Sequence, residues 1–142
     1  MKISTYFSSE EATTSVTALV NRIHNQPSYE EWDTIKIVAA KMDKVREFLG
    51  NPIHVNSWFR CRALNDILSK VPHSQHIKGE AVDFICPGFG DTTEIFNALL
   101  PKLEEFEIDQ LILEGSGTRS WIHISFAVIP ARPPRNKSLI LR

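Results

Sequence analysis

The chain has few cysteines, almost no net charge and no long hydrophobic run, and each shortage removes a class of protein. Cys61 and Cys86 are the only two cysteines in 142 residues and do not form a CxxC pair. They are too few for a disulfide scaffold, so we expect both to be reduced, small buried residues. A net charge of −1 gives no reason to expect nucleic acid. No apolar run approaches the roughly 20 residues that a membrane-spanning helix needs.

The first six residues contain one lysine and no apolar core, so we expect no secretory signal and synthesis in the cytoplasm. The composition, 42% hydrophobic and 23% charged, is ordinary for a globular protein. The length fits one domain over residues 1–142, with enough chain to bury a core.

The longest periodic segment predicts the main helix. Ser28 and Glu31 have the spacing of a capping box, and Gly50 followed by Pro52 is a strong stop signal. The apolar residues between them recur at helical spacing: Trp32, Ile35, Val38, Ala39, Met42, Val45 and Leu49. We expect this helix to form much of the core.

Three shorter helices are predicted around it. Ser8 and Glu11 repeat the capping pattern, and Asp91 and Glu94 repeat it again. The expected apolar positions of the first are Ala12, Val16 and Leu19. A helix over residues 63–70 is expected to turn Leu64, Ile67 and Leu68 inward, and the helix after Asp91 to contribute Ile95, Phe96, Leu99 and Leu100.

Short alternating segments predict strands at residues 53–56, 80–85, 109–114 and 121–126. The last two are joined by Gly115 to Ser120, a connection that suits antiparallel pairing. The tail from Pro130 is proline-rich and basic, and we expect it to wrap the surface. Helices followed by antiparallel strands predict an α+β fold, with a small antiparallel sheet packed against helices.

Two of these strands carry polar residues on the face opposite their apolar residues. Ile122 and Ile124 share one face of their strand, so His123 points to the other face. In the same way, Asp83 points to the face opposite to that of Val82. Gly79 permits a sharp reversal that would bring His76 back over Asp83.

Two histidines and one aspartate are the ligand set of an open catalytic zinc site. With Zn²⁺ they give a net charge of +1 and leave a fourth position for water. Each residue alone is more often an ordinary core or surface residue, but His76, Asp83 and His123 together favour a metal site.

The motifs around these residues resemble a known family. Ser74-x-His76-x-x-Gly79-x-Ala81-x-Asp83, followed by Trp121-x-His123, looks like the zinc D-alanyl-D-alanine carboxypeptidase family, which includes murein endopeptidases and shares its fold with the hedgehog signalling domain. The segments 6–11, 57–60 and 109–114 resemble its subgroup of phage and bacterial murein peptidases. The resemblance covers nearly the whole chain.

The resemblance implies a role for each matched residue. His76, Asp83 and His123 would bind one Zn²⁺ per chain. Arg60 would hold substrate carboxylate or carbonyl groups, for which a guanidinium fork is suited; the alternative is a surface salt bridge. Further residues expected around the bound substrate are Ser74, Gln75 and Trp121.

The general base is less directly indicated. Several family members carry an acid three positions before the last histidine, where this chain has Ser120, and a serine cannot take a proton from water with comparable effect. Glu114 would lie near Trp121, diagonal to His123, if the last two predicted strands pair. The subgroup also carries a glutamate there. We predict Glu114 as the base, the alternative being a surface glutamate at a strand end.

The resemblance implies a zinc peptidase that hydrolyses D,D- or L,D-type bonds in peptidoglycan stem peptides or cross-links, as a carboxypeptidase or endopeptidase. A lone catalytic domain without a secretion signal suggests a phage lysis or virion protein. Two alternatives stay open: a non-catalytic peptide-binding module that keeps the metal-site fold, and an intracellular hydrolase of small peptides.

Overall fold

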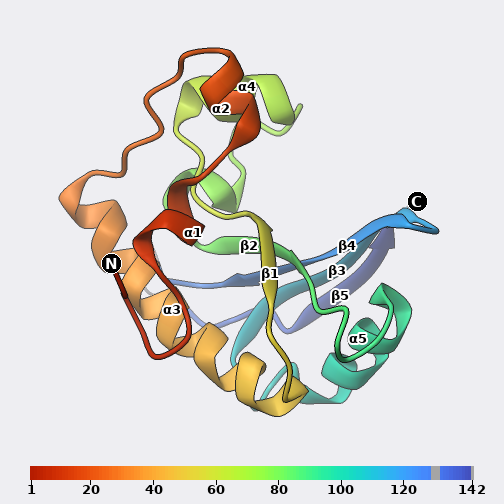
Figure 1. Cartoon of the computed structure of the whole chain (residues 1–142). Coiled ribbons are helices and arrows are strands. Elements are labelled where there is room, and N and C mark those ends of the chain that lie inside the picture. The colour runs from red at the N-terminus through yellow and green to blue at the C-terminus, as the bar shows by residue number, and fades with distance from the viewer. Residues whose placement is uncertain (129–131, 142) are drawn as a thin grey trace.

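The computed structural model describes residues 1–128 and 132–141, which form a five-stranded mixed sheet with helices on both sides (Figure 1). The strands are β1 (His54–Ser57), β2 (Ala81–Ile85), β3 (Ile108–Ser116), β4 (Arg119–Phe126) and β5 (Lys137–Leu141), in the order β1-β2-β4-β3-β5. The predicted α+β class is confirmed. No helix of the described ranges is long and apolar enough to cross a bilayer.

The long helix α3 (Tyr29–Leu49) forms as the sequence predicts. Ser28 and Glu31 make both hydrogen bonds of a capping box, and Gly50 ends the helix in the left-handed conformation at φ 67°. The predicted apolar stripe is buried except for Trp32, which is half-buried. This stripe packs against the sheet and supplies much of the core.

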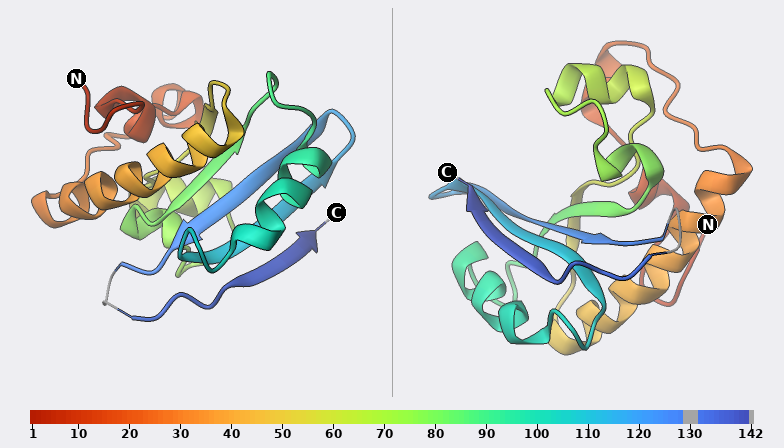
Figure 2. Two further views of the ribbon diagram at one scale, coloured as in Figure 1. Left: turned by 90° about the horizontal axis from the view of Figure 1, so that it is seen from below. Right: turned by 180° about the vertical axis from the view of Figure 1, so that it is seen from behind.

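The two faces of the sheet have different neighbours. Seen from below, α3 and α5 (Thr92–Leu99) lie across one face (Figure 2). Their buried residues form one cluster with the strand residues of that face, among them Val82 and Ile122. Asp83 and His123 alternate with these residues and therefore point to the opposite face. One face of the sheet is core, and the other is free to carry a site.

The first predicted helix is two helices, α1 (Ser9–Thr13) and α2 (Val16–Val20). Ser15 is extended, and its side chain accepts a hydrogen bond from the Ala18 amide, so it starts a second helix in a new direction. The expectation that Val16 and Leu19 are inward is wrong, because these side chains are 75% and 79% exposed.

Two other helices end earlier than their apolar residues suggest. Helix α4 (Arg62–Leu68) buries Leu64 but leaves Ile67 and Leu68 exposed. Leu100 starts the 3-10 helix η2 (Leu100–Lys102), after α5 has ended, and is also exposed. Ile67 and Leu68 share the side of α4 that carries Leu64, but the helix is buried only at Leu64 and Asn65, so its last turn stays exposed. Leu100 is exposed because it lies beyond the end of α5.

The connection between β3 and β4 is shorter than expected. The strands pair from Ile108↔Phe126 to Ser116↔Arg119, leaving only residues 117 and 118 as the turn. Residues 115–120, assigned to the connection from sequence, are mostly strand. The result is a long hairpin rather than a six-residue loop.

The tail also differs from the expectation. Residues 137–141 form β5, which pairs in parallel with β3 and makes the sheet mixed rather than antiparallel. Pro130 lies outside the described residues. The tail therefore extends the sheet instead of only wrapping the surface.

Two fully buried carboxylates, Glu80 and Asp109, anchor this tail. Arg135 donates from Nε to Asp109 Oδ1 (3.0 Å) and from Nη2 to Oδ2 (2.7 Å), and Arg132 Nη2 lies 3.2 Å from Glu80 Oε1. Gln75 bridges both acids through Nε2, at 3.1 Å from Glu80 and 3.0 Å from Asp109. Buried charge is tolerated here because each carboxylate has a guanidinium and further donors.

Burial raises the pKa of Asp109, but the hydrogen bonds from Arg135 outweigh burial and hold the pKa below its ordinary value. Ionised Asp109 therefore stabilises the fold at pH values above its unfolded pKa of about 3.9. That stabilisation is lost as the pH falls through the lower folded pKa.

Arg135→Ala is expected to lower the free energy of unfolding at pH 7 by about 2 kcal/mol, because it leaves a buried carboxylate short of its charged donor. The difference from wild type should shrink as the pH falls below about 4, where the unfolded carboxyl becomes protonated. Urea titrations at several pH values measure both effects. Arg119→Ala, at an exposed position of β4, is the control; an equal loss in both variants would contradict the role of the ion pair.

Candidate metal centre

Three elements bring His76, Asp83 and His123 together. Strands β2 and β4 are neighbours, and their register places Asp83 opposite His123. The 3-10 helix η1 (Gln75–Lys78) carries His76 over the same strand. Asp83 Oδ1 lies 3.2 Å from His76 Nε2 and 3.0 Å from His123 Nδ1. One ligand atom from each residue lies within 4.8 Å of the others.

The turn that delivers His76 is fixed by Gly79 and Trp58. Gly79 has a φ of 78°, and a Cβ there would lie 2.7 Å from Ile35 Cγ1, so the turn needs glycine for its conformation and for its contact with α3. The buried indole of Trp58 donates from Nε1 to the Gly79 carbonyl at 3.1 Å. The core thereby holds the turn in place.

The orientation of the His76 ring decides which nitrogen is available. Its Nδ1 lies 2.7 Å from the Trp58 carbonyl oxygen, which can only accept, so Nδ1 carries the proton. In the neutral ring, Nε2 is then an acceptor facing the carboxylate of Asp83. Two facing acceptors are stabilised by a cation, and the donor set of two imidazoles and a carboxylate fits a metal ion.

Asp83 is the negative centre of the site. Burial raises the pKa of its carboxyl, but His76 and His123, when their rings are protonated, outweigh burial and hold the pKa well below its usual range. Arg60 adds an ion pair, with Nη2 at 3.3 Å from Asp83 Oδ2. Asp83 is therefore ionised over the whole range in which the protein would work, as a metal ligand must be.

Arg60 is locked at the edge of the site. It donates from Nε to Ser57 Oγ at 3.0 Å and from Nη1 to Asn65 Oδ1 at 3.4 Å, in addition to its contact with Asp83. Its side chain is only 11% exposed, so it is not a surface salt bridge. Burial lowers the pKa of its guanidinium, and the carboxylates of Asp83 and Glu114 oppose that shift. The guanidinium is thus held in one orientation.

A cavity of about 440 Å³ opens over the three candidate ligands. Glu114 lies on its wall, opposite Trp121 in the β3–β4 register, while His123 is opposite Ile112. This is the diagonal placement that the sequence predicts. The tail contributes Arg135 and Leu141 to the same wall.

Ser74, Gln75 and Trp121 also line this cavity, but their polar groups are used differently. The hydroxyl of Ser74 accepts from the His76 amide and caps η1. The amide nitrogen of Gln75 binds the two buried acids, so only Oε1 is left. Gln75 Oε1 and Trp121 Nε1 are buried and have no hydrogen-bond partner within the described residues.

Ser120 lies on the other face of β4. Its hydroxyl is 2.5 Å from Thr92 Oγ1 and donates to the Gly117 carbonyl at 2.9 Å. It does not line the metal cavity. His73 lies on the cavity wall without joining the cluster of candidate ligands in the described chain.

Trp58 holds His76 in place, a role that the sequence does not indicate. The indole is 1% exposed, packs edge-on against Phe7 and does not reach the cavity. Its backbone carbonyl and its Nε1 both contact the turn that carries His76. Only the tertiary structure reveals the contact with His76, because a hydrogen bond to a backbone carbonyl leaves no pattern in the sequence.

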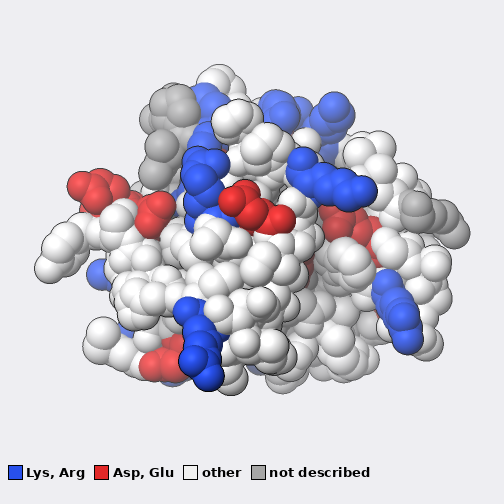
Figure 3. Space-filling view, turned by 90° about the horizontal axis from the view of Figure 1, so that it is seen from above, with Lys and Arg blue, Asp and Glu red and all other residues white. Residues whose placement is uncertain are grey.

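The described part of the face seen from above has no broad basic surface. Lys and Arg are interspersed with Asp, Glu and uncharged residues in the described part of that face (Figure 3). This distribution agrees with the near-zero net charge of the sequence.

Trp58→Phe is expected to weaken metal binding by about tenfold, the lower end of the cost of losing a group that orients a metal ligand, because the indole holds the turn and not His76 itself. The change removes the hydrogen bond to Gly79 and keeps an aromatic ring in the core. Competition with a chromophoric chelator measures the affinity. Trp32→Phe, on α3, is the matched control, and equal affinities in the two variants would refute the role of Trp58.

The described geometry agrees with the comparison with known proteins. A search among curated proteins finds no match. The family model described as Peptidase M15 matches residues 5–125, a span that includes the three candidate ligands, Arg60 and Glu114. The match covers most of the chain, and the chain therefore belongs to the peptidase M15 family, a family of metallopeptidases.

Proposed function

We propose that the protein is a zinc-dependent peptidase that hydrolyses peptide bonds in the stem peptides or cross-links of bacterial peptidoglycan. The observation that carries the proposal is the convergence of His76, Asp83 and His123 at a cavity that also contains Arg60 and Glu114. Family membership supports peptide hydrolysis, and the resemblance of the motifs to murein peptidases supports the substrate.

The donor set supports zinc. Two imidazole nitrogens and one carboxylate oxygen are typical ligands of catalytic zinc, and three protein ligands leave a position open. His76 Nε2, Asp83 Oδ1 and His123 Nδ1 are the atoms that face one another. When bound, zinc polarises a carbonyl group and makes water more acidic.

Glu114 is the proposed proton acceptor. A carboxylate on the cavity wall can take the proton of the attacking water and pass it to the departing amine. Ser120, at the position where several relatives have an acid, is excluded from this role by its chemistry and by its place on the other face.

Arg60 and the unpaired polar atoms would position the peptide. The fixed guanidinium suits a carbonyl or carboxylate group of the substrate. Trp121 Nε1 offers a donor and Gln75 Oε1 an acceptor, and a buried polar atom without a partner is costly until a ligand pairs with it. A peptide group supplies both complements.

A second candidate is a peptide-binding module that keeps the metal site without catalysis. The observation in its favour is Ser120, which replaces the acid of several family members. The two functions differ in one measurable respect, which is cleavage by a metal-loaded protein.

Purified wild-type protein is expected to release new amino groups from peptidoglycan, to lose this activity with a chelator and to regain it with zinc. Glu114→Gln should lower kcat by at least about 100-fold while binding one equivalent of zinc, because it removes only the proton acceptor. His76→Ala should lose both zinc and activity. Mass analysis of the digested muropeptides identifies the bond that is cut.

Glu30→Gln, at an exposed position of α3, is the control and should be fully active. Full zinc occupancy without cleavage of any stem peptide would favour the binding module. Turnover of free dipeptides but not of the wall would favour an intracellular peptidase.

We also propose that the protein acts at the cell wall as a phage lysis or virion-associated enzyme. The support is the resemblance of its motifs to the phage and bacterial murein peptidases. Export of the protein by a pathway of its own host would contradict this setting.

A further inference from the structure

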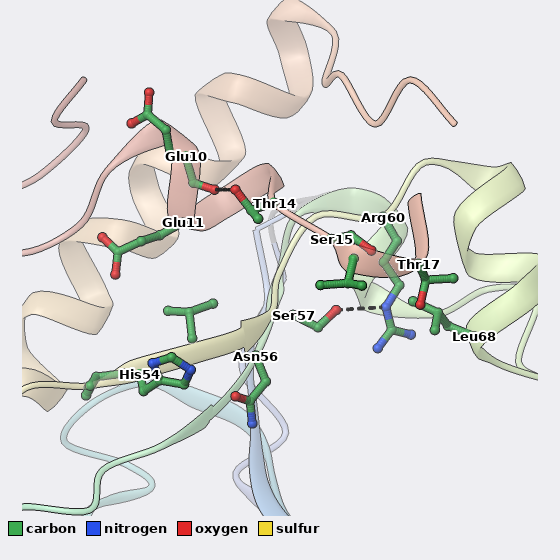
Figure 4. Close-up of a pocket in the computed structure, with 13 residues that line it drawn as sticks. Glu10, Glu11, Thr14, Ser15, Thr17, His54, Asn56, Ser57, Arg60 and Leu68 are labelled. Carbon is green, nitrogen blue, oxygen red and sulfur yellow. Dashed lines mark hydrogen bonds between the residues drawn. The ribbon is translucent and has the colours of Figure 1, made fainter. Parts of the chain in front are cut away.

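Strand β1 lies at the edge of the sheet and borders a second, larger groove. Within the described residues it pairs with β2 alone, so its other edge has no strand partner. The groove has a volume of about 640 Å³, with residues 53–57 on one side and α1 and the start of α2 on the other (Figure 4).

This groove borders the metal cavity. Arg60 and Leu68 line both. The guanidinium of Arg60 donates to Ser57, in the groove, and to Asp83, in the metal site. A ligand that extends from the metal cavity past Arg60 would reach the groove along β1.

The groove has the chemistry of a peptide site. An edge strand offers backbone donors and acceptors to an added extended chain, which is a recurring mode of peptide recognition. At about 3.4 Å per residue, the four residues of β1 match about four residues of such a chain. The facing wall adds the hydroxyl groups of Thr14, Ser15 and Thr17.

The charges at the two ends of the groove favour one direction of binding. Glu10 and Glu11 lie at one end and Arg60 at the other (Figure 4). Glu10 pairs with the N-terminal ammonium at 2.7 Å, whereas Glu11 accepts hydrogen bonds, among the described residues, from Ser8 alone, which is uncharged. Glu11 has no ion-pair partner in the described chain and could bind an amino group of the ligand, while the carbonyl end of the ligand would point to Arg60 and the metal site.

We propose that the groove binds the acyl side of the substrate, meaning the residues N-terminal to the cleaved bond, as an extended strand added to the edge of β1. The proposal rests on the proposed peptidase function. It assigns the cleaved bond to the carboxyl end of a stem peptide, where about four residues precede it. The bond after the first stem residue would leave the groove almost empty.

The test uses synthetic stem peptides that end in D-alanyl-D-alanine and are lengthened on the acyl side by one residue at a time. For the zinc-loaded wild type, kcat/KM should rise by about tenfold or more over the first three or four residues and then level off, because remote contacts contribute to catalysis. N-methylation of the acyl-side amides should remove this gain.

Val16→Trp and Leu19→Trp form a matched pair. Both residues are exposed on α2, at 75% and 79%, but only Val16 lines the groove. Val16→Trp should abolish the gain in kcat/KM with peptide length. Leu19→Trp should behave as wild type.

A kcat/KM that does not rise with acyl length, or a gain that survives both Val16→Trp and N-methylation, overturns the groove assignment. So does cleavage after the first stem residue. If wild type cleaves no peptide, the proposed function fails, and binding of a fluorescent stem tetrapeptide decides the groove separately. Equal affinities of wild type and Val16→Trp for this tetrapeptide would then refute the groove assignment.

Discussion

The hydrogen bond between the His76 ring and the Trp58 carbonyl is the contact on which the site depends. It fixes the tautomer of His76, so that Nε2 is turned toward Asp83. It also joins the segment after β1 to the turn before β2, two parts of the chain that the sheet alone would not align. The carbonyl is fixed because the Trp58 side chain is buried in the core. Packing in the core thereby sets the position of a candidate metal ligand.

Charge is buried on both sides of the same turn. Asp83 is compensated by Arg60 and two imidazoles, and the pair of Glu80 and Asp109 by two arginines of the tail. Gln75, directly before His76, hydrogen-bonds to the second cluster. A buried charge is stable only with its partners in place, so these clusters fix the turn more narrowly than apolar contacts would. The tail, outside the span of the family match, thus supports the metal site.

The two faces of the sheet have different roles, and this explains how so small a protein holds both a core and a candidate site. Strand alternation gives one face to α3 and α5 and leaves the other for the site. Because β1 is an edge strand, the proposed peptide groove can run along it beyond the metal site. Arg60 lies on the wall that the cavity and the groove share, and its three hydrogen bonds hold it in one orientation.

The sequence alone determined the features that depend on local chemistry. The capping boxes, the apolar stripe of α3 and the alternation that sets Asp83 and His123 apart from the core could all be predicted, because neighbouring residues decide them. Interactions between distant segments were decided by the tertiary structure. Three features depend on residues far away in the chain: the exposure of Val16, the parallel pairing of β5, and the hydrogen bond between Trp58 and His76. No local pattern encodes such contacts.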